Sequence, residues 1–177
     1  MNVTREHLAT AGNACRRVVR QLYPDDDGTC VLTVKLLIET LSRQGVQCRP
    51  VTASALVMNK QLYRQFKRQS PKQEEGGLQY RASEKSHAIW LGGRESGAVR
   101  HVVALVDGAG GTLLVDPSLD QANRPEKNTK GLSTLVADTS GPFLRGEERR
   151  VYERRGCGLA YELHPRDHWY EAAPDWN

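Results

Sequence analysis

The chain carries a cysteine, a histidine and an aspartate in an order that suits nucleophilic catalysis. Cys30 opens an apolar helical pattern, His101 starts a strand-like run, and Asp116 ends the next such run. A histidine that takes the proton of a thiol, with a carboxylate that orients the histidine, makes an activated cysteine nucleophile. The sequence therefore predicts a Cys30–His101–Asp116 triad.

The segment between the histidine and the aspartate has the composition of a tight hairpin turn. Residues 107–111 read Asp-Gly-Ala-Gly-Gly, and such pairs favour two-residue turns. A turn centred near residue 108 or 109 places His101 directly opposite Asp116, with Cβ atoms roughly 5 Å apart on one sheet face. A shift of one residue would instead turn the carboxylate to the other face.

The predicted nucleophile lies at the start of a helix. Apolar residues recur at Val34, Leu37, Ile38 and Leu41, which predicts a largely buried helix from about residue 30 to residue 44, ended by Gly45. The exposed N–H groups of a helix N-terminus lower the pKa of a thiol. Three aspartates at 25–27 would raise that pKa if they point at the thiol, or they cap the helix. The alternative is that Cys30 is a small core residue without chemistry.

The rest of the chain positions these residues in a predicted α+β fold of one domain spanning 1–177. An amphipathic helix capped by Thr4 runs to about Tyr23, and a short helix is expected near 59–69. Extended segments are expected at the following positions: 46–58, 86–91, 99–106, 112–116 and 157–163. The polar stretch 70–83 is expected to be a loop near the site that acts as a lid or binding loop.

The order of these features resembles the transglutaminase-like superfamily of papain-type folds. Gly28-Thr29-Cys30, the buried helix after it, a strand with histidine and a strand ending in Asp-Pro carry the resemblance over about residues 28–120. The fifteen positions from His101 to Asp116 are similar to those in arylamine N-acetyltransferases. The resemblance implies a papain-like fold, with a central N-terminal helix packed on an antiparallel sheet. It also implies a cysteine enzyme that acts on an amide or thioester carbonyl.

Four further residues are candidates for the site. Gln21 and Trp90 are candidates for the family's oxyanion-hole partner, and Gln121 is either a substrate-positioning amide or a solvent-facing side chain. If residues 92–98 link two paired strands, His87 falls opposite Val103, on the same face as the histidine of the triad. His87 would then be the base itself, a substrate contact or a structural histidine.

Composition restricts the class of protein. The chain of 177 residues has 38% hydrophobic and 26% charged residues, a net charge of +4 and four widely spaced cysteines. No signal-peptide pattern and no apolar run of membrane-spanning length is seen, which predicts a reduced cytoplasmic protein. Its expected partner is a peptide, protein or small acyl substrate, with no cofactor. Basic residues cluster at 60–72, but no recognition motif supports nucleic-acid binding.

Two other interpretations remain open at this point. One is a catalytically silent binding module with the same fold, whose pocket holds a peptide or partner. The other is a zinc site that combines His164 and His168 with the histidine and aspartate of the triad, although their spacing matches no recognised ligand pattern. Neither hydrolysis nor acyl transfer is favoured by the sequence, and the oligomeric state is not indicated.

Overall fold

The computed structural model describes residues 3–24, 29–69, 85–91 and 100–172. Helices and antiparallel strands are mixed along the chain, which confirms the predicted α+β class. In chain order, with η for a 3-10 helix, the elements are α1 (Arg5–Leu22), α2 (Cys30–Ser42), β1 (Cys48–Met58), α3 (Lys60–Gln69), β2 (Ala88–Leu91), β3 (His101–Gly108), β4 (Gly111–Asp116), η3 (Leu119–Ala122), η4 (Pro125–Lys127), β5 (Leu135–Asp138), α4 (Gly141–Leu144), β6 (Arg150–Arg154), β7 (Cys157–His164) and η5 (Trp169–Ala172).

The strands form one antiparallel sheet around the long strand β1. The order is β5-β4-β3-β1-β7-β6, and β2 also pairs with β1. On one edge of β1, residues 48–53 pair with β3 and residues 55–58 pair with β2. The two strands therefore follow one another along the same edge and do not pair with each other. The expected position of His87 opposite Val103 is wrong, because Val103 pairs with Val51.

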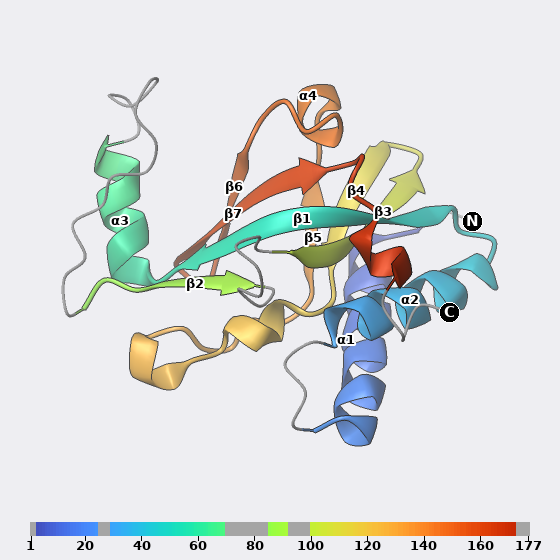
Figure 1. Ribbon diagram of the computed structural model, residues 1–177, viewed down its shortest axis with the longest axis horizontal. Helices are drawn as coiled ribbons and strands as arrows, with labels where there is room; N and C mark the ends of the chain where they lie inside the picture. Colours follow the sequence, from blue (N-terminus) through green and yellow to red (C-terminus); the bar gives the residue numbers. More distant parts are fainter. Residues whose placement is uncertain (1–2, 25–28, 70–84, 92–99, 173–177) are drawn as a thin grey trace.

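Helices α1 and α2 cover one face of the sheet (Figure 1). The predicted apolar stripe of α2 is confirmed, since Val34, Leu37 and Leu41 are fully buried. They pack with residues of α1, β3 and β4, among them Leu8, Val102, Ala104, Val106 and Val115. The predicted N-cap of α1 is also present, because Thr4 accepts a hydrogen bond from the His7 amide. This packing fixes the direction of α2 relative to β3.

The end of α2 follows the predicted glycine signal. Gly45 has a φ of 74°, a left-handed conformation that glycine adopts without strain. The Val46 amide donates to the Leu41 carbonyl and the Gly45 amide donates to the Ser42 carbonyl, at 3.1 and 2.9 Å. These two bonds form a Schellman motif. The motif ends the helix and directs the chain into β1.

The other face of the sheet is concave, and a single hydrogen bond shows this. Strands β3 and β1 lie between β4 and β7, so a flat sheet would hold β4 and β7 roughly 14 Å apart. The Tyr161 hydroxyl on β7 nevertheless donates to Asp116 on β4 at 2.6 Å. The sheet must therefore curve until these strands approach each other across its inner face. Ala53 and Ala55 leave room between them, because both are small and fully buried on β1.

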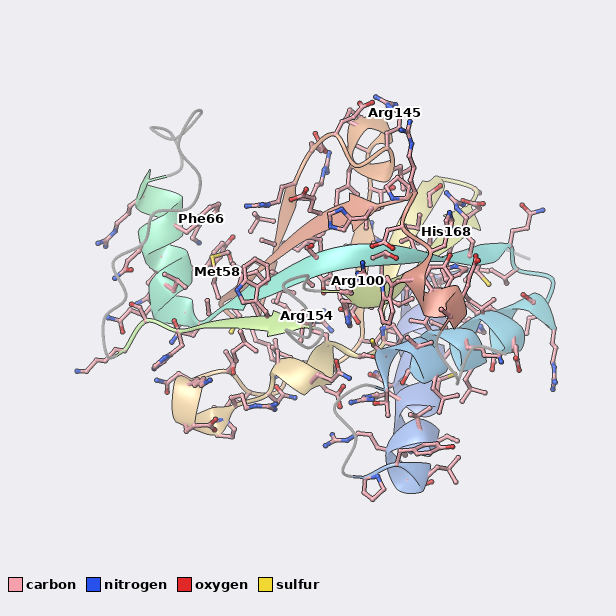
Figure 2. The ribbon with its side chains drawn as sticks, in the orientation of Figure 1. Met58, Phe66, Arg100, Arg145, Arg154 and His168 are labelled. Carbon is pink, nitrogen blue, oxygen red and sulfur yellow. The ribbon has the colours of Figure 1, made fainter. Side chains whose placement is uncertain are left out.

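At the far end of β1, α3 packs on the sheet through its apolar side. Met58 and Phe66 lie between the helix and the strands (Figure 2). The Tyr63 ring lies so close to Gly158 of β7 that an added Cβ would be 2.2 Å from the ring. Glycine at this position is therefore what allows α3 to dock.

Several boundaries differ from the sequence-based expectations. The predicted strand at 86–91 begins at Ala88, and β5, β6 and α4 were not predicted. The lid expected over 70–83 and the aspartates at 25–27 lie outside the described residues. Among the helices of the described segments, none combines the length and the apolarity needed to span a bilayer.

Candidate active site

His101 and Asp116 are in direct contact on the concave face of the sheet. His101 Nε2 and Asp116 Oδ2 are 3.0 Å apart, and both side chains are fully buried. The register that was predicted to bring them together is wrong, because Val115 pairs with Ala104 and the turn is centred between residues 109 and 110. His101 is thus diagonal to Asp116, two positions from direct opposition. A shift of two residues keeps the side chain on the same face, so the contact survives.

The Asp116 carboxylate is held by three donors. Oδ2 accepts hydrogen bonds from His101 Nε2 and from the Tyr161 hydroxyl, and Oδ1 accepts one from the Ser118 amide at 2.9 Å. Burial alone would raise the pKa of Asp116, but the charge of His101 and these hydrogen bonds outweigh burial and lower it. Burial and the neighbouring carboxylate raise the pKa of Tyr161 well above 10.0, so the phenol stays a neutral donor. The carboxylate is therefore ionised and fixed in orientation.

The Cys30 thiol lies on the other side of the imidazole. Nε2 is occupied by Asp116, and Nδ1 has no nitrogen or oxygen partner among the described residues, which leaves Nδ1 for the thiol. Burial raises the pKa of Cys30, but hydrogen bonding to His101, the imidazolium charge and the Val102 amide outweigh burial. The pKa of Cys30 is therefore below 9.0. The structure brings the three residues of the predicted triad together.

His101 shifts in the opposite direction. Burial lowers the pKa of this imidazole, but the charge and hydrogen bond of Asp116, with smaller contributions from Cys30, raise it to about 10. A lowered thiol pKa beside a raised imidazole pKa favours a thiolate–imidazolium pair near neutral pH. Cys15 and Cys157, by contrast, have pKa values raised mainly by burial. Chemistry therefore distinguishes Cys30 from the other buried cysteines.

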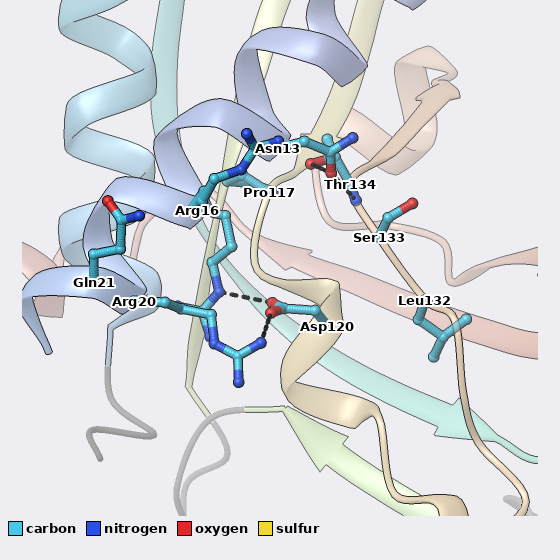
Figure 3. A pocket seen from close by; sticks show the side chains of 10 residues that line it. Asn13, Arg16, Arg20, Gln21, Pro117, Asp120, Leu132, Ser133 and Thr134 are labelled. Carbon is cyan, nitrogen blue, oxygen red and sulfur yellow. Dashed lines mark hydrogen bonds and ion pairs between the residues drawn. The ribbon is translucent and has the colours of Figure 1, made fainter. Parts of the chain in front are cut away.

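A buried ionic network that sequence reasoning missed supports the start of α2. Arg16 of α1 donates through Nε to Asp120 at 2.7 Å and through Nη1 to the hydroxyl of Thr29, the residue before Cys30. Arg20 donates to the other oxygen of Asp120 at 3.0 Å (Figure 3). The Thr29 side chain makes no capping bond to α2. A basic pair four residues apart in a helix was the only signal in the sequence, and it also fits a solvated face.

The weaker candidates lie away from the three site residues or serve other contacts. Trp90 pairs with Leu56 and so lies on the sheet face opposite to that of His101. The His87 carbonyl accepts from the Asn59 amide, which places His87 about 20 Å along β1 from the site. Gln21 is an exposed residue of the pocket in Figure 3.

The segment after β4 returns to α1. Gln121 lies in η3, where its amide donates to the Ser118 carbonyl. Its neighbour Asp120 is engaged by two arginines of α1, so the side chain of Asp120 serves the ionic network and does not approach the thiol.

The zinc alternative has no support in the described segments, which contain no group of three His, Cys, Asp or Glu side chains that could hold a metal ion. His164 Nε2 lies 2.7 Å from the Ser54 hydroxyl, and His168 Nδ1 lies 3.1 Å from the Tyr170 hydroxyl. These histidines therefore have local partners of their own.

Comparisons with known proteins leave the family open. Neither a scan against protein-family models nor searches of curated proteins and of solved structures finds a match. The case for function therefore rests on the geometry of the site.

Proposed function

We propose that this protein is a cysteine-dependent enzyme that acts on an amide or thioester carbonyl through Cys30, His101 and Asp116. The observation that carries the proposal is the buried His101 ring, bound to Asp116 through Nε2 and interacting with the Cys30 thiol on its other side. This is the arrangement of an activated nucleophile and its oriented base.

The chemistry follows from the protonation states. The Cys30 thiolate attacks the carbonyl carbon, and the electron pair of the C=O bond moves to oxygen. The intermediate collapses when His101 gives its proton to the leaving amine or thiol, which leaves an acyl thioester on Cys30. Water, deprotonated by His101, then releases an acid, whereas an amine acceptor gives acyl transfer. Asp116 keeps the ring oriented and stabilises its charge throughout.

The start of α2 supplies a donor for the oxyanion. The first amides of a helix have no intrahelical acceptor, and the Cys30 amide is the first of α2. Because Thr29 does not cap these amides with its side chain, they are available to an oxygen that develops charge beside the thiol. The contact from Arg16 to Thr29 holds this end of the helix.

The order of elements supports the finer proposal of a papain-like, transglutaminase-type fold. The cysteine helix comes first and packs on an antiparallel sheet, and the histidine and aspartate follow on adjacent strands. All four cysteines are unpaired, which fits the reduced cytoplasmic location that we propose. A peptide, protein or small acyl compound is the proposed substrate.

Burial favours one alternative, a catalytically silent module of the same fold. Cys30 is only 3% exposed, and His101 and Asp116 are 0% exposed. A substrate can therefore reach the thiol only after a movement that exposes Sγ. A silent module needs no such movement.

Alkylation with iodoacetamide separates the two functions, because the chain carries matched internal controls. Cys15, Cys30 and Cys157 are 5%, 3% and 3% exposed, so reagent access is similar for the three thiols. An enzyme predicts that Cys30 is alkylated far faster, with a rate midpoint below pH 8. Mass spectrometry of the labelled peptides measures each rate separately.

A second measurement tests the acyl-transfer step. An activated ester such as p-nitrophenyl acetate should acetylate Cys30, and Cys30→Ser and His101→Ala should each abolish the adduct while the fold is retained. Equal alkylation rates at the three buried cysteines, together with no acetyl adduct on Cys30, would reject the enzyme and leave the silent module.

A further inference from the structure

A second concave site lies at the opposite end of β1 from His101. It has a volume of about 690 Å³. The lining comes from α3 and from three segments far from it in the sequence, around residues 85, 128–130 and 155–157. His101 pairs with Ala53, and Asn59 of the cavity lies six residues further on, about 20 Å away. The cavity is therefore separate from the proposed active site.

The charge of this cavity is of one sign. Six of the eleven lining residues are basic and none is acidic: Lys60, Arg64, Arg68, Lys85, Lys130 and Arg155. Within the described segments, none of the six makes an ion pair. The remaining lining residues include asparagine and glutamine, whose amides also donate hydrogen bonds. Like charges gathered around a concave surface repel one another, so an anion bound there would be stabilised by all of them.

The floor of the cavity is held by one buried side chain. Asn59 is 1% exposed, and its Nδ2 donates to the carbonyls of Lys85 and Lys127, at 2.9 and 3.1 Å. Its Oδ1 accepts from the Leu62 amide in the first turn of α3. A single asparagine thus joins three segments of the chain, so the cations that these segments carry have fixed anchor points.

Two of the cations also have ordered stems. The side chain of Arg155 passes over Gly131, and that of Lys60 passes over Gly156, each close enough that an added Cβ would be 3.4 Å away. Arg155 itself has a φ of 51° in the turn between β6 and β7, where asparagine or glycine is usual. An arginine therefore occupies a turn position that its backbone does not favour, with its guanidinium directed along the cavity wall.

We propose that this cavity binds an oligophosphate, a soluble ligand with two or more linked phosphate groups. Six cations exceed what a single carboxylate or monophosphate needs, and Arg, Lys and amide donors are the groups that bind phosphate oxygens. The cavity is lined by no aromatic residue of the described segments, so it offers no platform for stacked bases. A phosphate chain therefore fits the cavity better than a single-stranded nucleic acid.

Inorganic tripolyphosphate is the direct probe, measured by isothermal titration calorimetry on the full chain at low and at physiological salt. We expect binding that weakens with salt, and a loss of about tenfold in affinity for each of Lys130→Ala and Arg155→Ala. Arg166→Ala is the matched control, because it removes the same charge from an exposed residue beyond the other end of β7. It should change the affinity less than twofold.

Two further measurements give the proposal its alternatives. Cys30→Ser should bind tripolyphosphate like the wild type, because the two sites are separate. A short oligodeoxythymidine that binds more tightly than tripolyphosphate and is lost in the same variants would identify a nucleic-acid surface and overturn the proposal. Absence of tripolyphosphate binding, or equal losses in Arg155→Ala and Arg166→Ala, would also overturn it, since only general surface charge would then be at work.

Discussion

Asp116→Asn isolates the part of the site that sets the charge on the imidazole. The Asp116 carboxylate is the main reason that the pKa of His101 is about 10 and not 6.5, a difference of about 5 kcal/mol in favour of the charged ring. Burial, which lowers the pKa of His101, is unchanged by the substitution. The ring in the variant is therefore neutral at pH 7, and the Cys30 thiol loses its cationic partner.

The expected magnitude follows from the thiol. Without the imidazolium, burial raises the pKa of Cys30 above 9.0, so that fewer than about 1 in 100 thiols are ionised at pH 7. Alkylation of Cys30 by iodoacetamide at pH 7 should slow by about 100-fold, and its midpoint should move from below pH 8 to above pH 9. Peptide mass spectrometry measures this against Cys15 in the same molecules.

Tyr161→Phe is the matched control for this prediction. It removes one hydrogen bond from Asp116 but leaves the negative charge, so the alkylation rate should fall only a few-fold. If Asp116→Asn destabilises the fold, His101→Gln tests the same coupling from the other side. An unchanged rate and midpoint in folded Asp116→Asn would refute the ion-pair reasoning.

Three more perturbations test other parts of the structure. In Cys30→Ser, His101 titrates without the thiol, and its raised pKa contributes stability that is complete below pH 6.5 and is lost as the pH rises; urea unfolding should show this decline. Arg16→Leu leaves a largely buried carboxylate unpaired and should lower the free energy of unfolding by about 3 kcal/mol, while slowing alkylation of Cys30. Gly158→Ala drives a methyl group into the Tyr63 ring, so it should cost about 1–3 kcal/mol and weaken tripolyphosphate binding by displacing α3.

Each of these has a counterpart in the same chain. Arg5→Ala breaks an exposed ion pair with Asp138, and should cost less than about 1 kcal/mol. At Gly110 an added Cβ meets nothing within 4 Å, so Gly110→Ala should leave both stability and binding unchanged. The decline in Cys30→Ser should vanish when His101→Ala is added. Equal effects in a variant and its counterpart would contradict the corresponding explanation.

The sequence predicted the contact between His101 and Asp116 for a reason that tolerates error. Side chains alternate between the faces of a strand, so a register that is wrong by two residues still leaves both side chains on the concave face. The same reasoning failed for His87, because it assumed that neighbouring strands in the chain would pair. Strand β1 has eleven residues, long enough to take β2 and β3 in succession along one edge.

What the sequence missed depends on tertiary packing. Strand β6 reads Arg-Val-Tyr-Glu-Arg and is mixed in charge, so no hydrophobic alternation distinguishes it from a loop. The contact from Arg16 to Asp120 joins residues that are 104 positions apart. The cations of the basic cavity come from four separate segments, and only those of α3 are adjacent in the sequence. Each of these features exists only after the sheet has closed.

The composition of the concave face argues that the buried triad is retained for chemistry. Apolar residues such as Val103, Leu105 and Leu114 form this face around the site. Replacing a buried ionic network with well-packed apolar side chains is often neutral or stabilising, so stability alone does not require one here. This network is nevertheless complete, since both oxygens of Asp116 and both nitrogens of His101 have partners. A fully bonded ion pair that includes a thiol is costly as a structural device, and it is what a cysteine nucleophile requires.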